Sequence, residues 1–287
     1  MSIQSKFDGT RCVFSIECFP PRQTAQFEPL KDALQAMRAL SPEFISVTFG
    51  AGGSAGGVST VEVASYIQNE LGVDALAHLI CMGNDRASIA SLAQQLQAAG
   101  VGEVLALRGD RSPTRVPSSD FPHASDLAGY LHTAAPGISL HGACYPEGHP
   151  ESDTLRQDVQ NLLYKQQAGV GHLITQLFFD NIHFYRFLNL ARRAGVTLPV
   201  SAGVMPIVKR SQIERTVALS SASLPSAFTR MISRWQDDAP SLYAAGIDYA
   251  VQQLRDLIEG GADGVHLYAM NDAAVAAKVY EGIRDLL

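Results

Sequence analysis

The chain has 287 residues, of which 46% are hydrophobic and 17% charged, and its formal net charge is −6. This length and apolar content suit a single α/β barrel, which takes roughly 250 residues. No run of Lys and Arg offers a surface for a phosphate backbone, which excludes a DNA or RNA partner. No apolar stretch approaches the about 18 residues of a membrane span, and residues 1–10 lack an export signal. We therefore expect a cytoplasmic protein with no membrane partner.

The four cysteines are Cys12, Cys18, Cys81 and Cys144, and no two of them form a C-x-x-C pair. A disulfide framework is typical of short secreted chains and not of an apolar chain of this length. We expect each cysteine to be a small, buried, apolar residue. This interpretation agrees with a reducing cytoplasm.

Short apolar, β-branched runs recur along the chain, and each is followed by a polar loop and a helical pattern. Eight runs predict strands, at residues 12–17, 44–48, 75–80, 103–107, 138–143, 173–177, 200–204 and 264–268. Their ends recur about every 30 residues, the size of one βα unit, but the last interval is about twice as long. Alternating order implies a parallel sheet, and eight units favour a closed barrel over an open, doubly wound sheet. We predict a single (β/α)8 TIM barrel over residues 1–287.

The segments between these runs have the 3.6-residue apolar period of helices. One apolar face consists of Phe27, Leu30, Leu34, Met37 and Leu40, and a less regular one of Leu155, Val159, Leu162, Leu163 and Gln166. Glycines that suit left-handed caps follow four helical stretches: Gly100, Gly169, Gly195 and Gly261. The long interval between the seventh and eighth strands is expected to hold extra helix at 212–219, 226–235 and 241–258. No linker divides the chain, so no regulatory domain is expected.

The expected carboxyl ends of the strands are polar, and a barrel enzyme binds its substrate at that end. The residues concerned are Glu17, Thr48, His78, Arg108, Gly109, Asp110, Tyr145, Gln176 and Tyr268. A core histidine or a strand-end cap explains any single one of them, but not the set. For Arg108 and Asp110 the alternative is an ion pair with each other at the rim.

Glu17 is the strongest candidate for chemistry, because Phe14, Ile16, Cys18 and Phe19 lie around it in sequence. Apolar surroundings disfavour the charged form of a carboxyl group, which makes Glu17 a candidate general acid. The alternative is a strand-end carboxylate that caps the next segment.

Two other patterns are weaker. The Gly-rich run 50–57 could cradle a phosphate, but it lacks the spacing of a P-loop or Rossmann fingerprint, and a flexible loop is favoured. His141 and Cys144 have opposite parity on one strand and cannot share a metal ion. A candidate metal cluster, explained as well by a loop of mixed polar residues, consists of Glu147, His149 and Asp158. No metal is predicted.

Six motifs resemble the methylenetetrahydrofolate reductase family in its short, bacterial, flavin-dependent form. They are FSIECFPP at 14–21, SVTFGAGGS at 46–54, LRGD at 107–110, YPEGHP at 145–150, ITQLFFD at 174–180 and GVMP at 203–206. The motifs follow family order over nearly the whole chain, and together they are specific. The resemblance implies a barrel that holds FAD at the carboxyl ends of its strands.

By position, Glu17 resembles the family's proton donor, and Asp110 resembles the carboxylate between flavin and folate. The other positions that resemble FAD contacts or flavin neighbours are Thr48, Phe49, His78, Arg108, Gly109, Ala124, Tyr145, His149, Asp158, Asn161 and Lys165. The positions expected to contact folate or nicotinamide are Gln176, Gln212 and Tyr268. The i, i+3, i+7 spacing of Asp158, Asn161 and Lys165 places them on one helical face.

The resemblance implies a ping-pong reaction in one-carbon and methionine metabolism. NADH or NADPH reduces FAD and leaves, and 5,10-methylenetetrahydrofolate then binds. Glu17 protonates the folate so that its five-membered ring opens to an iminium, and hydride transfer yields 5-methyltetrahydrofolate. Two alternatives stay open: a flavin-binding paralogue with another one-carbon folate, electron donor or partner, and a catalytically idle regulatory subunit. Neither the choice of NADH or NADPH nor the oligomeric state follows from the sequence, and a homo-oligomer is compatible with it.

Four positions depart from the family pattern. Asp272 stands where a basic residue is common near the folate, and Thr216 stands where phenylalanine is common. Phe49 replaces a tyrosine, and Ala55 replaces an arginine of the Gly-rich run. We therefore expect the folate side to differ from the family more than the flavin side does.

Overall fold

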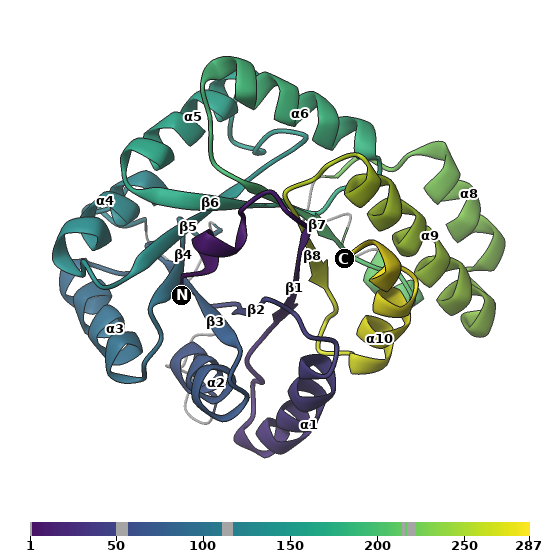
Figure 1. Ribbon diagram of the computed structural model, residues 1–287, viewed down its shortest axis with the longest axis horizontal. Helices are drawn as coiled ribbons and strands as arrows, with labels where there is room; N and C mark the ends of the chain where they lie inside the picture. The colour runs from purple at the N-terminus through teal and green to yellow at the C-terminus, as the bar shows by residue number, and fades with distance from the viewer. Residues whose placement is uncertain (1, 50–56, 111–116, 214–215, 217–221) are drawn as a thin grey trace.

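The computed structural model describes residues 2–49, 57–110, 117–213, 216 and 222–287 (Figure 1). Eight parallel strands pair in chain order, and β1 pairs with β8 to close the barrel. The strands are β1 Val13–Cys18, β2 Phe44–Val47, β3 Asp74–Ile80, β4 Glu103–Leu107, β5 Ser139–Cys144, β6 Val170–Thr175, β7 Val200–Val204 and β8 Gly264–Tyr268. The predicted (β/α)8 TIM barrel is confirmed.

The strand with the largest error in its predicted bounds is β6. It begins at Val170, three residues before the predicted start, and ends at Thr175, so that Gln176 follows the strand instead of lying in it. Gly171 and His172 interrupt the apolar run and hide the true start. His172 is a buried residue whose Nδ1 lies 3.0 Å from Nδ1 of His141. The polar His172 inside the barrel therefore made the predicted strand start three residues too late.

Helices surround the barrel (Figure 1). They are α1 Phe27–Arg38, α2 Thr60–Ser65, α3 Arg86–Ala98, α4 Ala124–Ala134, α5 Leu155–Gln167, α6 Asn181–Ala194, α8 Ser226–Trp235, α9 Ala239–Glu259 and α10 Ala273–Glu281. Shorter turns are η1 Ile3–Lys6, η2 Thr24–Gln26, η3 Tyr66–Glu70 and η4 Arg284–Leu286. The extra helical segment between β7 and β8 is confirmed by α8 and α9, whereas most of the predicted helix at 212–219 lies outside the described residues.

The predicted glycine caps are confirmed by positive φ angles. These angles are 74° at Gly100, 94° at Gly169, 98° at Gly195 and 81° at Gly261. At Gly169 a side chain would also lack space, because an added Cβ would lie 2.6 Å from Nδ1 of His132. The glycine therefore ends α5 and allows the chain to turn directly into β6.

Strand residues alternate between two environments. Phe14, Ile16 and Cys18 of β1 belong to the apolar layer between the strands and the helices. Ser15 and Glu17 lie on the opposite face of the strand, toward the barrel axis. The interior of the barrel therefore holds polar side chains, among them the buried residues Ser15, Ser46, His78, His141, His172, Ser201 and His266. It also holds a small apolar cluster that includes Val13, Phe44, Leu76, Leu105 and Ile174.

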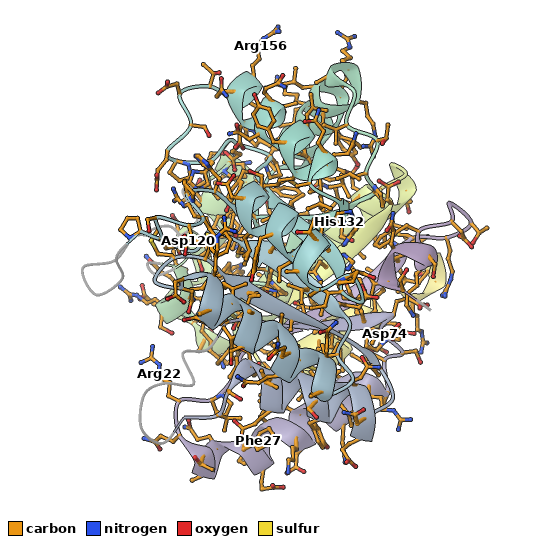
Figure 2. The ribbon with its side chains drawn as sticks, turned by 90° about the vertical axis from the view of Figure 1, so that its left-hand side faces the viewer. Arg22, Phe27, Asp74, Asp120, His132 and Arg156 are labelled. Carbon is orange, nitrogen blue, oxygen red and sulfur yellow. The ribbon has the colours of Figure 1, made fainter. Side chains whose placement is uncertain are left out.

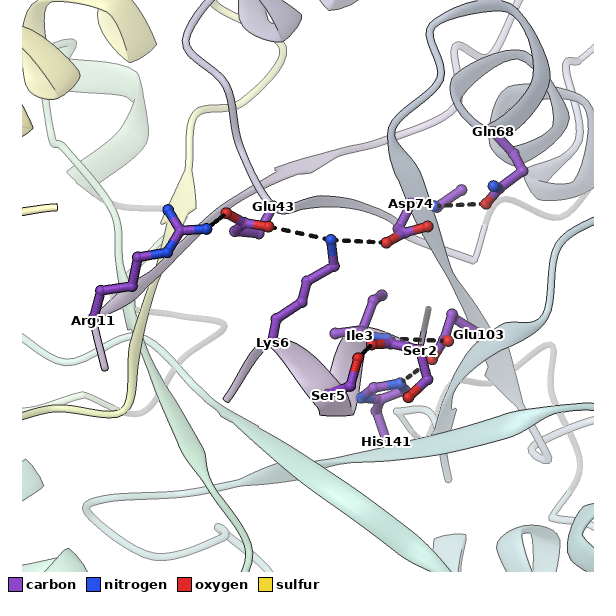
Figure 3. A network of polar contacts seen from close by, with 11 residues as sticks. Ser2, Ile3, Ser5, Lys6, Arg11, Glu43, Gln68, Asp74, Glu103 and His141 are labelled. Carbon is purple, nitrogen blue, oxygen red and sulfur yellow. Dashed lines mark hydrogen bonds and ion pairs between the residues drawn. The ribbon is translucent and has the colours of Figure 1, made fainter. Parts of the chain in front are cut away.

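The turn η1 lies across the centre of the barrel in Figure 1 and closes its amino-terminal opening. Ile3 is fully buried against Phe44 and other residues near the starts of the strands. The N–H of Ile3 donates to Oε1 of Glu103 at 3.2 Å, and Oε2 of Glu103 lies 2.7 Å from Nε2 of His141 (Figure 3). Residues 1–10 contain no pattern that predicts this plug.

Ion pairs attach the plug to the barrel rim. Nζ of Lys6 lies 3.1 Å from Glu43 and 2.9 Å from Asp74, and Arg11 also pairs with Glu43 (Figure 3). Glu43 precedes β2 and Asp74 begins β3, so the plug joins the first three strands at their amino ends.

The opposite opening, at the carboxyl ends of the strands, is called the mouth below. In the side view of Figure 2, Arg22 and Asp120, which follow β1 and β4, lie on one side, and Asp74 and His132 lie toward the other. All four cysteines are free; Cys18, Cys81 and Cys144 are buried as predicted, whereas Cys12 is only partly buried. Within the described ranges, no helix has the length and apolar character needed to cross a membrane.

Candidate active site

Glu17 lies near the carboxyl end of β1, at the mouth. Its side chain is 20% exposed, and Oε2 lies 3.6 Å from Nε2 of His78 and 3.9 Å from Nε2 of His266. The register of the sheet places Glu17 beside Ser46 of β2 and Tyr268 of β8. A partly exposed carboxyl group with two imidazoles at its base can exchange a proton with a ligand in the mouth.

The surroundings of Glu17 differ from the predicted apolar ones. Phe14, Ile16 and Cys18 pack against the helices on the other face of β1. The groups that surround Glu17 come from neighbouring strands, because adjacent residues of one strand point in opposite directions. The sequence-based reason for choosing Glu17 was therefore wrong, although the residue does lie at the mouth.

His78 of β3 is buried, and burial lowers the pKa of its imidazole to about 4, so the ring is neutral near pH 7. Its Nε2 has no hydrogen-bond partner among the described residues. A buried polar atom in this state costs about 1–3 kcal/mol unless a partner is supplied. The atom is therefore suited to contact a bound ligand.

His266 of β8 was missed by the sequence analysis. Its Nδ1 lies 2.7 Å from Oγ of Ser15, and its Nε2 lies 3.2 Å from Oγ of Ser46. These contacts fix the ring below Glu17. The available signal was spacing, because His266 precedes Tyr268 by two residues and must share its face of β8.

Tyr268 crosses the interior of the barrel from β8 to β6. Its hydroxyl donates to the carbonyl oxygen of Thr175 at 2.6 Å, and burial raises the pKa of the phenol. The ring passes over Gly203 of β7, where an added Cβ would lie 2.5 Å from Cε2 of Tyr268. The hydroxyl is thus bound to the protein, and only the ring remains for the predicted substrate contact.

The loop after β4 carries Arg108, Gly109 and Asp110. Nη1 and Nη2 of Arg108 donate to Glu151 at 2.8 and 2.6 Å, so Arg108 pairs with Glu151 and not with Asp110. The predicted alternative of an ion pair within the motif is wrong. Gly109 has a φ of 87°, and an added Cβ would lie 3.2 Å from Cβ of Met82. Asp110 is exposed beyond this turn, on the mouth side.

The loop after β5 is organised by Asp158 of α5. This buried carboxylate accepts hydrogen bonds from the N–H of His149 at 3.2 Å and from Oγ of Ser152 at 3.3 Å. The ring of Tyr145 packs edge-on against His149 at 4.7 Å between centroids. Burial raises the pKa of the Asp158 carboxyl group and raises the pKa of the Tyr145 phenol to about 12. Burial also lowers the pKa of the His149 imidazole.

Lys165 follows Asp158 by two turns of α5, with the partly buried Asn161 between them. Its Nζ donates to the carbonyl oxygen of Ala143 at 2.6 Å, and burial lowers the pKa of the ammonium group. The three predicted residues therefore share the helix face that meets β5.

Thr48, Phe49 and Ala124 lie on loops or helix starts that follow strands. The carbonyl oxygen of Thr48 accepts a hydrogen bond from Thr60, and Phe49 packs against the outer apolar layer. Ala124 is the first residue of α4. The Gly-rich run that follows Phe49 lies almost entirely outside the described residues, including Ala55.

Gln176 and Gln212 lie after β6 and β7. Oε1 of Gln176 accepts from the N–H of Leu177 at 2.9 Å. Oε1 of Gln212 accepts from the N–H groups of Val208 and Lys209 at 2.9 and 2.8 Å. These bonds fix the orientation of both amides at the mouth.

Asp272, the main departure on the folate side, has a structural role. It is the N-cap of α10, where Oδ1 accepts from the N–H of Val275 at 3.2 Å. Oδ2 lies 3.5 Å from Nζ of Lys209. Thr216 is buried, and its hydroxyl lies 3.6 Å from the sulfur of Met205.

The predicted alternative of a metal cluster at Glu147, His149 and Asp158 does not form. Both carboxylate oxygens of Glu147 accept from the N–H of Ser223, at 3.2 and 3.1 Å, and His183 lies 3.6 Å away. Among the residues that the structure describes, no three His, Cys, Asp or Glu side chains are placed to hold a metal ion.

The sequence comparisons with known proteins agree on one family. The family model described as methylenetetrahydrofolate reductase matches residues 2–284. The 5,10-methylenetetrahydrofolate reductases of Salmonella typhimurium and Escherichia coli are each 30% identical over 264 residues, which is 91% of this chain and 87% of theirs. Methylenetetrahydrofolate reductase (NADH) 1 of Arabidopsis thaliana is 30% identical over 285 residues, but only 48% of its length is matched.

A solved structure of the same fold is an uncharacterized protein from Clostridium thermocellum that binds two copies of 5-methyl-5,6,7,8-tetrahydrofolic acid. It covers all of this chain with a TM-score of 0.68 at 11% identity. At that identity the likeness concerns the fold alone. The family model and the bacterial relatives, which match nearly the full length, carry the assignment: this chain belongs to the methylenetetrahydrofolate reductase family.

Proposed function

We propose that the chain catalyses the FAD-dependent reduction of 5,10-methylenetetrahydrofolate to 5-methyltetrahydrofolate with NADH or NADPH as electron donor, in a ping-pong mechanism. Family membership supports methylenetetrahydrofolate reduction as the overall reaction of an oxidoreductase. The single observation that carries the proposal for this chain is the position of Glu17, a partly exposed carboxyl group held at the mouth beside His78 and His266. The free cysteines suit a cytoplasmic enzyme of one-carbon metabolism.

The residues at the mouth fit FAD. Nε2 of His78 is a buried polar atom without a described partner, and Arg108 supplies a cation with N–H donors for an anionic group. Gly109 has a φ of 87°, which turns the backbone between Arg108 and Asp110. We assign the remaining contacts to Thr48, Phe49, Asp110, Ala124, Tyr145, His149, Asp158, Asn161 and Lys165. Bound FAD would supply the hydride chemistry of both half-reactions.

The chain's own residues bind, orient and protonate. Glu17 holds a proton at the mouth and transfers it to a ring nitrogen of the folate, which opens the five-membered ring. Asp110, exposed after the turn at Gly109, is assigned to the pterin and the cofactor. Gln176, Gln212 and the ring of Tyr268 are assigned to the substrate, since their orientations are fixed by hydrogen bonds to the backbone.

The test is an anaerobic absorption spectrum of purified protein, recorded before and after NADH and again after methylenetetrahydrofolate. We expect a flavin band that bleaches with NADH and returns with the folate. A protein that is colourless and takes up no added FAD would remove the proposal. The same titration with NADPH compares the two donors.

A second candidate is a flavin-binding paralogue that uses another one-carbon folate, donor or partner protein. The ion pair of Asp272 with Lys209 favours it, because this departure from the family pattern partly neutralises a cation beside the start of α10. Reduction by NADH without reoxidation by methylenetetrahydrofolate would support this candidate. A regulatory subunit would bind FAD and fail in both half-reactions.

A further inference from the structure

The guanidinium group of Arg108 is held in one plane at the mouth. Nη1 and Nη2 donate to the two oxygens of Glu151 at 2.8 and 2.6 Å, and Nε donates to the carbonyl oxygen of Gly109 at 3.3 Å. A guanidinium group bound to a carboxylate through two parallel hydrogen bonds has a defined orientation as well as a defined position. Glu151 belongs to none of the residues assigned above to cofactor or substrate.

The loop that carries Glu151 is itself fixed to the barrel. The N–H of Glu151 donates to Nδ1 of His149 at 3.1 Å, and the N–H of His149 donates to Asp158 at 3.2 Å. Ser152 donates to the other oxygen of Asp158, which is buried in α5. The backbone of the loop that carries Glu151 is therefore anchored to α5 by a continuous set of hydrogen bonds, and the carboxylate, whose side chain is 38% exposed, is held by Arg108.

Arginine has five N–H donors, and the three bonds described use one on each nitrogen. Each terminal nitrogen keeps one further N–H, in a plane that Glu151 has already set. We propose that Glu151 is a positioning residue, which holds Arg108 so that these two remaining donors are oriented for the flavin cofactor before it binds. This inference rests on the proposed function and adds a residue to its site.

The alternative role for Glu151 is competition with the cofactor. If Glu151 competed with an anionic part of the cofactor for Arg108, its removal would strengthen binding. If it orients Arg108, its removal weakens binding, because the arginine must then lose its rotamer freedom at the moment of binding. The two roles therefore predict changes of opposite sign.

The experiment compares Glu151→Gln with Asp285→Asn in the full-length protein freed of flavin. Asp285 forms the same kind of pair with Arg255, at 2.7 and 3.0 Å, between α9 and the carboxyl-terminal turn η4. This second pair lies at the end of α9 that leads into β8, away from the mouth, and controls for the loss of a bidentate pair as such. Binding of FAD is followed by the quenching of its fluorescence, and folding by thermal melting.

We expect the dissociation constant of FAD to rise roughly threefold to tenfold in Glu151→Gln and to stay within about twofold of wild type in Asp285→Asn. Glu151→Asp keeps the anion and should recover part of the affinity. An unchanged or tighter constant in Glu151→Gln would overturn the inference, as would a lower melting temperature without weaker FAD binding. If the wild type itself binds no FAD, the proposed function is refuted as well.

Discussion

Glu17 and Arg108 show how differently two charged side chains can be held at one mouth. Arg108 is fixed by bonds of 2.6 to 2.8 Å to a carboxylate, which suits binding a group whose position must not vary. Glu17 has its two imidazole neighbours at 3.6 and 3.9 Å and is partly exposed, which suits a proton that must be given up. These environments support a binding role for the first residue and a proton-transfer role for the second.

Glu17→Gln separates the two half-reactions. The amide keeps the size of the side chain but has no acidic proton. We expect FAD binding and its reduction by NADH to be unchanged, and reoxidation by methylenetetrahydrofolate to slow by a factor on the order of 10²–10⁴. Stopped-flow absorbance of the flavin follows each step separately. Reoxidation at the wild-type rate would show that another group provides the proton.

Tyr268→Phe tests the bond between β8 and β6. The change removes a hydroxyl that donates to the carbonyl oxygen of Thr175 at 2.6 Å and leaves the ring in place. We expect a loss of about 0.5–1.5 kcal/mol in the free energy of unfolding. Urea unfolding measures this loss. If the free energy of folate binding fell by more than the free energy of unfolding, the hydroxyl would also contact the substrate.

At the scale of single elements, two helical segments make polar contacts at opposite ends of the barrel. At the mouth, α10 begins at a cap, Asp272, that also lies 3.5 Å from Lys209. At the opposite end, η1 inserts Ile3 into the strand starts and binds Glu103. The first arrangement places charge at the mouth, whereas the second lies at the amino-terminal end and is expected to affect stability alone.

Asp272→Asn removes the charge at the start of α10 and keeps an oxygen for the cap, because asparagine caps helices about as well as aspartate. Lys209 is then no longer neutralised. We expect tighter binding of methyltetrahydrofolate with little change in stability, measured by isothermal titration calorimetry and urea unfolding. Asp272→Ala is the control for the cap, with a loss of about 1 kcal/mol in stability. Equal folate affinity in wild type and Asp272→Asn would show that Lys209 does not contact the folate.

Ile3→Ala tests the amino-terminal plug. Truncation of a fully buried isoleucine leaves a cavity, and we expect the free energy of unfolding to fall by about 2 kcal/mol or more. The exposed Ser5 of the same turn is the matched control, since Ser5→Ala should change stability by less than about 0.5 kcal/mol. FAD affinity should be the same in both variants. Equal stability of the two variants would mean that η1 does not close the barrel in solution.

At the scale of the whole molecule, the barrel interior contains imidazoles that stay neutral when folded. Burial lowers the pKa of His78 to about 4 and that of His172 well below its usual range. In the unfolded chain both rings take up a proton near pH 6.5. The unfolded state therefore binds more protons than the folded state below that pH, and acid favours unfolding.

This comparison predicts the sign of a pH profile. The contribution of His78 is fully present above about pH 6.5 and is lost as the pH falls toward 4, by an amount on the order of 3 kcal/mol. Burial raises the pKa of Asp158, which opposes part of this change. Urea unfolding of flavin-free protein at pH 7, 6 and 5 measures the slope. His78→Gln should reduce it, and an equal slope in both proteins would contradict the assignment.

The sequence was sufficient to predict the fold, because the apolar pattern of each strand can be recognised from residues that are neighbours in the chain. Outward residues such as Ile16 and Val204 produce recognisable apolar runs, and β4, β7 and β8 have the predicted bounds. The sequence was insufficient where a residue's role depends on a partner far along the chain. Arg108 meets Glu151 43 positions later, and Ile3 meets Glu103 100 positions later. His266 was passed over as part of a strand, although its spacing of two residues from Tyr268 places both side chains on one face of β8.

The pairing of β1 with β8 has a consequence for how the chain is made. Ser15 and His266, joined inside the barrel, are 251 positions apart, so the barrel cannot close until nearly the whole chain has left the ribosome. At about 5–20 residues per second, the edge of β1 stays unpaired for on the order of ten seconds or more. An open parallel edge is a template for pairing with other nascent chains. The yield of folded protein in cells should therefore depend strongly on the supply of chaperones, even if the finished barrel is stable.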